Sequence, residues 1–184
     1  MKALILSLAL LLQTNSLWSS NRQIDHLPQS HFKDQLQTQK IEKMIKKVNP
    51  IVKAHKRKKV AKIIQQVTKT YKIDPKVMIA IIDTESEFIQ HKISSSGDLS
   101  IAQINLKVWN KELKRLNLET INEKKLIKDE KYALVQMGRI LSILKDRHAE
   151  TDKKWYATYH SKTKKFKNIY SKKVDLRIRK IASL

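Results

Sequence analysis

The residues best suited to chemistry follow a strongly apolar stretch near the middle of the chain. Residues 77–82 are all apolar, and Asp83, Glu85 and Glu87 come directly after them. A carboxylic acid at the end of a buried helix is poorly solvated, which disfavours its charged form and raises its pKa. A general acid needs such a raised pKa if it is to hold a proton near neutral pH. Glu85 is therefore a candidate general acid.

A segment of small residues follows the acidic one. Residues 94–98 read Ser-Ser-Ser-Gly-Asp and predict a loop, and the amide of Gln103 comes shortly after it. A flat loop of serine and glycine leaves room for a bulky substrate to lie close to the backbone. Asp83 and Glu87 lie on a helical face different from that of Glu85, and we expect both to be solvated.

The composition excludes several classes of site. The chain has 184 residues with no Cys, two Gly and three Pro, which rules out disulfides, Cys nucleophiles and Gly-rich phosphate loops. Its six His residues show no paired spacing, so we expect no metal and no cofactor. The formal net charge of +22 indicates an anionic partner, such as nucleic acid, a membrane surface or an acidic wall polymer. The charge alone does not choose among them.

Helices must position these residues, because apolar residues recur every three or four positions from residue 36 onward. Asp74-Pro75 is a strong helix start, with an N-cap acceptor followed by a proline at the first helical position. The helix that follows should be central and buried and should end near residues 88–89. Pro50 is tolerated as the first residue of another helix. Further helical patterns cover residues 41–48, 60–71, 101–116, 132–144, 154–160 and 172–181. The sequence predicts an all-α single domain.

The N-terminal residues are typical of an export signal. A basic start precedes residues 3–12, in which only Ser7 is polar, and a stretch of small and polar residues follows. This apolar run is shorter than the roughly 20 residues that a helix needs to cross a bilayer, so we expect no stable membrane span. We interpret residues 1–20 as a signal peptide, residues 21–37 as a flexible lead and residues 38–184 as the domain. The protein is then exported, to the periplasm or the cell wall.

The block around Glu85 resembles the soluble lytic transglycosylase domain, a family with a lysozyme-like fold that cuts the glycan strands of peptidoglycan. The family pattern runs approximately E-S-x-F and then S-x-x-G-A-x-G-L-M-Q. Ser94, Gly97 and Gln103 lie nine, twelve and eighteen residues after Glu85, in register without a gap. The family's later A-Y-N motif is similar to residues 157–160, which read Ala-Thr-Tyr-His. The resemblance covers about residues 63–170, most of the chain after the predicted signal peptide.

The resemblance implies a reaction at the bond between N-acetylmuramic acid and N-acetylglucosamine. Glu85 would protonate the glycosidic oxygen. As a base it would then take the proton from the muramoyl C6 hydroxyl while that hydroxyl closes a 1,6-anhydro ring. One carboxylate suffices, unlike the two of most glycosidases. The expected partner is the peptidoglycan glycan strand. The residues expected to bind it are Ser94, Gln103, Asn105, Tyr159 and His160.

Several residues depart from the family pattern. Residues 100–102 read Ser-Ile-Ala where Gly-Leu-Met is usual, Asp98 replaces a small alanine, and His160 replaces asparagine. These changes leave open a non-catalytic module that binds peptidoglycan or another glycan on the same fold. Asn105 favours the relatives linked to secretion systems, which makes such machinery, or that of cell-wall assembly, a candidate partner. Lysine-rich runs such as residues 53–62 support a third hypothesis, a basic nucleic-acid-binding protein, but the export signal disfavours it and we expect no nucleic acid.

Overall fold

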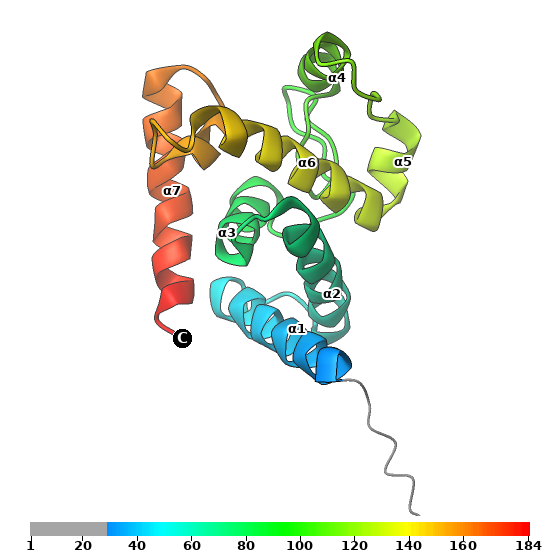
Figure 1. The fold of residues 1–184 in the computed structure, drawn as a ribbon, viewed down its shortest axis with the longest axis vertical. Coiled ribbons are helices and arrows are strands. Elements are labelled where there is room, and N and C mark those ends of the chain that lie inside the picture. The colour runs from blue at the N-terminus through cyan, green and yellow to red at the C-terminus, as the bar shows by residue number, and fades with distance from the viewer. Residues whose placement is uncertain (1–28) are drawn as a thin grey trace, which may run out of the picture.

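The computed structural model describes residues 29–184, in which helices form nearly all of the regular structure (Figure 1). The elements of this part of the chain are α1 (Gln29–Val48), α2 (Ala54–Tyr71), α3 (Pro75–Ser86), α4 (Leu106–Arg115), α5 (Glu123–Lys128), α6 (Glu130–His148), the 3-10 helix η1 (Trp155–Tyr159) and α7 (Lys164–Ala182). The prediction of an all-α single domain is confirmed. The predicted signal peptide, residues 1–20, lies outside the described residues.

Helix α3 occupies the centre of the fold, where it packs against α1, α2 and α7 (Figure 1). It is central because residues 78–82 offer no polar side chain, and all of them are fully buried. As predicted, Asp74 caps the helix: its carboxylate accepts a hydrogen bond from the backbone N–H of Lys76 at 2.8 Å, and Pro75 is the first helical residue. Helix α3 therefore begins at a fixed residue, Pro75, and its last turn lies at one side of the core.

The end of α3 comes two or three residues earlier than the sequence predicts. Glu87 and Phe88 both adopt left-handed backbone conformations, with φ of 52° and 66°, and this reversal stops the helix at Ser86. Phe88 is 1% exposed, so its burial anchors the turn. The Ser86 hydroxyl then donates to the backbone oxygen of Ile101 at 2.7 Å, which fastens the end of α3 to the loop that follows.

A buried ion pair ties the last turn of α3 to two other helices. Arg177 of α7 donates from Nε to the Asp83 carboxylate at 2.6 Å, and Asn49, at the end of α1, donates to its other oxygen at 2.9 Å. Asp83 is 6% exposed. The expectation that Asp83 is solvated is therefore wrong: the apolar helix buries this carboxylate, and a cation and an amide from distant segments satisfy it.

Three other expectations about the elements need correction. Pro50 does not begin a helix, since α2 begins at Ala54 after a turn. Residues 29–37, taken as part of a flexible lead, are helical and belong to α1. The helix expected from residue 101 begins at Leu106, because Ser100 and Gln103 adopt left-handed φ values of 71° and 46° that interrupt any helix there.

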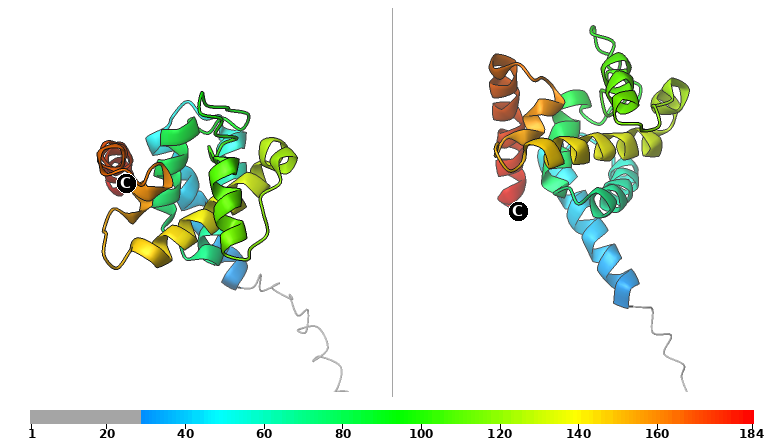
Figure 2. Two further views of the ribbon diagram at one scale, coloured as in Figure 1. Left: turned by 90° about the horizontal axis from the view of Figure 1, so that it is seen from above. Right: turned by 45° about the horizontal axis from the view of Figure 1, so that its top comes forward.

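None of the described helices is both long and apolar enough to cross a membrane. The amphipathic patterns read from the sequence instead bury one face of each long helix in a shared core. Helix α6 shows this most clearly, since it contacts α2, α5 and η1 along its length (Figure 2). Gly138 lies where α6 crosses α2, and the absence of a side chain allows this close approach.

The contact between α2 and α6 leaves no room for a side chain at Gly138. A Cβ atom there would lie 2.3 Å from Val67 Cγ1 and 2.8 Å from Tyr71 Cδ2. We expect Gly138→Ala to lower the free energy of unfolding by about 1–3 kcal/mol through overpacking, as measured by urea denaturation. Asp146→Ala, at an exposed position of the same helix, is the matched control and should change it by less than about 0.5 kcal/mol. Equal effects of the two substitutions would contradict this account.

Candidate active site

Glu85 lies in the last turn of α3, at the edge of the buried core. Its side chain is 15% exposed, far less than that of an ordinary surface glutamate. Within the described residues, the nearest basic side chain at ion-pair distance is His160, whose Nδ1 lies 4.0 Å from Glu85 Oε1. The Lys92 ammonium is nearby but donates to the backbone oxygen of Glu85 at 2.8 Å, not to its carboxylate. Glu85 is thus a shielded carboxyl without a close cation.

The surroundings of Glu85 favour its protonated form. Burial is the largest effect and raises the pKa of Glu85 from 4.5 to about 7. The hydroxyl of Tyr170 acts in the opposite sense, and the charge of Asp98 raises the pKa further. Lys92 and Lys173 lower it by smaller amounts. The net result is a carboxylic acid that still holds a proton close to neutral pH, as the sequence predicts for a general acid.

Two tyrosines and a histidine from the C-terminal third of the chain surround this carboxyl. Tyr159, in η1, is buried and donates from its hydroxyl to the backbone oxygen of Ala102 at 2.6 Å. Tyr170, in α7, is 4% exposed, and its hydroxyl has no hydrogen-bond partner within 3.5 Å although it lowers the pKa of Glu85. The rings of His160 and Tyr170 are stacked, with centroids 4.7 Å apart and planes 7° from parallel. This stack places Nδ1 of His160 near Glu85.

His160 is neutral at pH 7, since burial lowers the pKa of its imidazole below its usual value near 6.5. The charge of Asp98 opposes this effect and that of Lys173 adds to it. When Glu85 holds its proton it faces a neutral imidazole that is about half exposed. Their 4.0 Å separation exceeds a direct hydrogen bond, which leaves the acid's proton free for another acceptor.

The loop between α3 and α4 is organised around Asp98. Ser94 donates to one carboxylate oxygen of Asp98 at 2.9 Å, and Asn105 donates to the other at the same distance. Asn105 also caps α4, with its side-chain oxygen accepting from the backbone N–H of Val108 at 3.1 Å. These bonds hold the Asp98 charge at a fixed place from which it raises the pKa of Glu85.

Gln103 braces the same loop from inside. It is 8% exposed, and its side-chain amide donates to the backbone oxygens of Lys92 and Ser100, each at 2.9 Å. Together with the Asp98 network, this leaves Ser94, Gln103 and Asn105 as residues that shape one wall of the site through bonds within the protein. Tyr159 and His160 are the sequence-predicted residues that the structure brings directly to Glu85.

The rival carboxylates do not share the site of Glu85. Asp83 is paired with Arg177 on another side of α3, as described above. Glu87 is exposed, which confirms the expectation that it is solvated. Among these three acids, Glu85 alone is both shielded from water and without a short cation contact in the described residues.

Sequence reasoning missed Tyr170. The residue belongs to the buried stripe of α7, which also contains Ser171, Val174 and Ile181, and such a stripe is ordinarily only core. No local motif sets Tyr170 apart in the sequence. Only the packing of α7 against α3 and η1 shows that its hydroxyl lies close enough to Glu85 to affect the pKa of that carboxyl.

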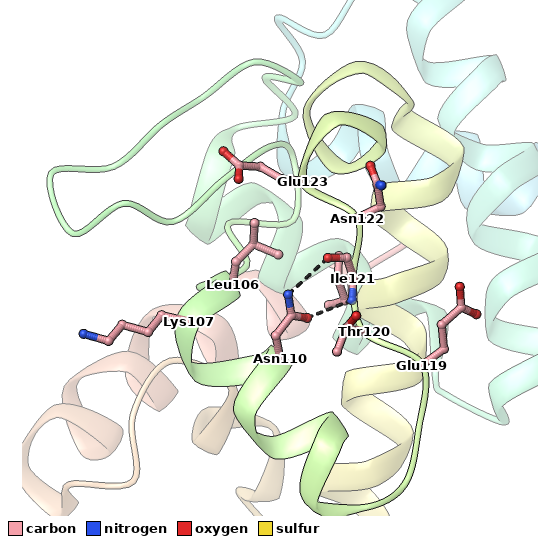
Figure 3. Close-up of a pocket in the computed structure, with 8 residues that line it drawn as sticks. All are labelled: Leu106, Lys107, Asn110, Glu119, Thr120, Ile121, Asn122 and Glu123. Carbon is pink, nitrogen blue, oxygen red and sulfur yellow. Dashed lines mark hydrogen bonds between the residues drawn. The ribbon is translucent and has the colours of Figure 1, made fainter.

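A hollow of about 600 Å³ lies elsewhere, between α4 and the segment that leads into α5 (Figure 3). Asn110 closes its wall, since the side-chain amide of this residue accepts from the backbone N–H of Ile121 at 2.7 Å and donates to its oxygen at 3.1 Å (Figure 3). None of the predicted site residues lines it. Across residues 29–184, no three His, Asp or Glu side chains gather as a metal site would require. The hollow therefore offers no chemistry comparable to that at Glu85.

The comparisons with known proteins give one match. A family model described as "LasA, N-terminal domain" matches residues 26–107. No curated protein and no solved structure matches the chain. The matched region contains Glu85 and the loop that Asp98 organises, but it ends before Tyr159, His160 and Tyr170. The similarity is thus to a stretch that carries the candidate acid and one wall of its site.

The raised pKa of Glu85 makes a prediction about stability. Because the folded pKa exceeds the unfolded one, the folded state binds more protons between pH 4.5 and about 7, and stability falls as the pH rises through this window. We expect Glu85→Gln to match the wild type near pH 4 and to exceed it by up to about 3 kcal/mol at pH 8. Urea denaturation at both pH values measures this, with Glu87→Gln as control. An unchanged difference between pH 4 and pH 8 would contradict the raised pKa.

The unpartnered hydroxyl of Tyr170 makes a second prediction. Since this hydroxyl lowers the pKa of Glu85, we expect Tyr170→Phe to raise that pKa further above 7 while the ring stack with His160 is kept. Carbon-detected NMR titration of the Glu85 carboxyl reads the shift directly. Tyr132→Phe, whose hydroxyl accepts from the backbone N–H of Asn122, is a tyrosine control that should leave the titration in place. A pKa that falls in Tyr170→Phe would refute the contact.

Proposed function

We propose that the protein is an exported peptidoglycan lytic transglycosylase that uses Glu85 as its single acid and base. The observation that carries this proposal is the pKa of Glu85, raised to about 7 in a shielded position beside two tyrosines and a neutral histidine. The in-register similarity of residues 85–105 to the family pattern supports it independently. The export signal predicted from the N-terminal sequence supports export, and the charge of +22 suits an anionic cell wall.

The proposed reaction balances without water. Glu85 gives its proton to the oxygen between N-acetylmuramic acid and N-acetylglucosamine, and the bond from that oxygen to the muramoyl C1 breaks. The muramoyl C6 oxygen forms a new bond to C1, and its hydroxyl proton passes to the Glu85 carboxylate. The acid is then restored, and the product carries a 1,6-anhydro ring. A group with a pKa near the working pH can perform both proton transfers.

The neighbours of Glu85 fit a reaction with one carboxylate. A second carboxylate would need to lie about 6.5–9.5 Å away to activate water, or about 5–5.5 Å away to act as a nucleophile, and be free to act. Asp83 is held by Arg177 and Asn49, and Asp98 is held by Ser94 and Asn105. The Tyr170 hydroxyl, which is buried and has no hydrogen-bond partner within residues 29–184, lies near the carboxylate that forms when Glu85 loses its proton.

A second candidate function is a non-catalytic glycan-binding module. The observation that favours it is the state of Gln103, whose amide protons are both used on backbone oxygens of the loop. A wall that is fixed by these hydrogen bonds can bind a sugar strand without cleaving it. This candidate predicts that the wild-type protein and Glu85→Gln bind peptidoglycan equally and that neither cuts it.

The products of peptidoglycan digestion test the proposal. We expect fragments with anhydro-muramoyl ends by mass spectrometry, and a loss of at least about 100-fold in rate for Glu85→Gln. Glu87→Gln, an exposed carboxylate two residues away, should keep the wild-type rate. Reducing ends would instead identify a hydrolase, and an absence of fragments from the wild type with retained binding would select the non-catalytic module.

The pH dependence follows from the same acid. Because Glu85 must be protonated to begin the reaction and its pKa is about 7, the rate should fall as the pH rises above 7. Initial rates of fragment release between pH 5 and 9 measure this. In Tyr170→Phe the midpoint of the fall should move to higher pH. A rate that climbs steadily to pH 9 would rule out Glu85 as the acid.

A further inference from the structure

The outward side of α7 carries three apolar side chains in one row. Phe166, Ile169 and Leu176 are 52%, 50% and 60% exposed, and their spacing of three and seven residues puts them on one side of the helix. Tyr170 and Val174 lie beside this row on the inward side of the helix and are buried against the rest of the fold. Figure 1 and both views of Figure 2 show α7 at the margin of the molecule, and no other helix of residues 29–184 lies over its outer side.

Basic side chains flank this row along its length. Helical periodicity places Lys165, Lys172 and Arg179 along one edge of the row and Lys173 within it, one turn after Ile169, and all four are exposed. We call these cations, together with Phe166, Ile169 and Leu176, the α7 face. Within the helix the acidic residue is Asp175, which bonds to Lys154 and Tyr156 at the side of the helix. The α7 face therefore combines apolar and cationic side chains without an opposing charge.

This combination distinguishes between kinds of partner. Single exposed apolar residues are ordinary, but a row of three on one helix is not. A glycan strand could lay the C–H face of a sugar ring on Phe166, but Ile169 and Leu176 offer it neither a flat ring nor a polar partner. Lysine-flanked apolar rows suit a lipid interface, where the apolar chains enter the acyl boundary and the lysine stems extend to the phosphates. The net charge of +22 also suits an extended anionic plane better than one acidic patch.

We propose that the α7 face docks on the surface of an anionic lipid bilayer, with the helix lying flat in the headgroup region. The helix does not span the membrane, in keeping with the absence of any spanning helix among the described residues. Lys173 belongs to the α7 face and is also close enough to Glu85 to affect its pKa. Docking would bring Lys173, and with it the surroundings of Glu85, near the headgroups. The inference does not require that Glu85 is catalytic.

Position-specific labels test the docking in the full chain, because the protein has no cysteine and one introduced cysteine is therefore unique. An environment-sensitive fluorophore on Ile169→Cys should shift to the blue with vesicles that contain phosphatidylglycerol, and should not shift with pure phosphatidylcholine vesicles. A label on Ile51→Cys, a position that is 89% exposed in the turn before α2, should stay in water with both. This pair separates insertion of α7 from attachment through any other segment.

A charge-reversal pair supplies the second arm. Lys165→Glu combined with Lys172→Glu should weaken partitioning onto phosphatidylglycerol vesicles by at least about 10-fold. Lys58→Glu combined with Lys62→Glu changes the net charge equally on an exposed part of α2 and should weaken it less than about 2-fold. Circular dichroism of both double variants checks that the helices are kept.

Several outcomes would overturn the proposal. These are an Ile169→Cys label that stays in water, an equal shift on neutral vesicles, an equal shift of the label on Ile51→Cys, or equal losses from the two charge reversals. A label on Ile169→Cys that responds to purified peptidoglycan or to an acidic protein, but not to vesicles, would assign the α7 face to that partner instead. Loss of glycan cleavage in Glu85→Gln should leave vesicle docking unchanged, so the two proposals fail separately.

Discussion

The arrangement depends on shielding two carboxyl groups that lie two residues apart on α3 and pairing only one of them with a cation. Asp83 receives Arg177 and Asn49, so its charge is satisfied and links α1, α3 and α7. Glu85 has no cation within hydrogen-bond distance among the described residues, with His160 Nδ1 4.0 Å away. Burial therefore raises its pKa to about 7. An ion pair that positions α7 thus also determines which tyrosine and which histidine reach the unpaired acid. Asp83 and Glu85 thus lie in the same turn of α3, but Asp83 stabilises the fold and Glu85 is the candidate reactive group.

The loop and α7 hold opposite sides of this site by different means. On the loop side, polar groups satisfy one another, with Asp98 at the centre and Gln103 beneath. On the α7 side, the rings of His160 and Tyr170 are stacked in parallel. The Tyr170 hydroxyl there has no hydrogen-bond partner among the described residues. The two sides of the site therefore differ in how fully their polar groups are satisfied.

Some of this could be predicted from the sequence and some could not. The start of α3 was predictable because Asp74-Pro75 is a local signal, and so was the burial of Glu85, because residues 77–82 leave no polar face. The pairing of Asp83 was not predictable, since its partners Asn49 and Arg177 lie 34 and 94 residues away in the sequence. Tyr170 was missed for the same reason. The roles of Ser94, Gln103 and Asn105 in the loop depend on backbone turns at Ser100 and Gln103 that no residue type announces.

Those turns have a consequence for how the protein could change. Between residues 87 and 103 four residues other than glycine, Glu87, Phe88, Ser100 and Gln103, adopt left-handed φ values, each at a cost of roughly 1–2 kcal/mol. Glycine at the solvent-facing Glu87 would remove part of that cost without disturbing a buried contact. Substitutions that relieve this backbone strain in the segment beside Glu85 would therefore raise the free energy of unfolding. Under selection for thermal stability, this segment could change before the core does.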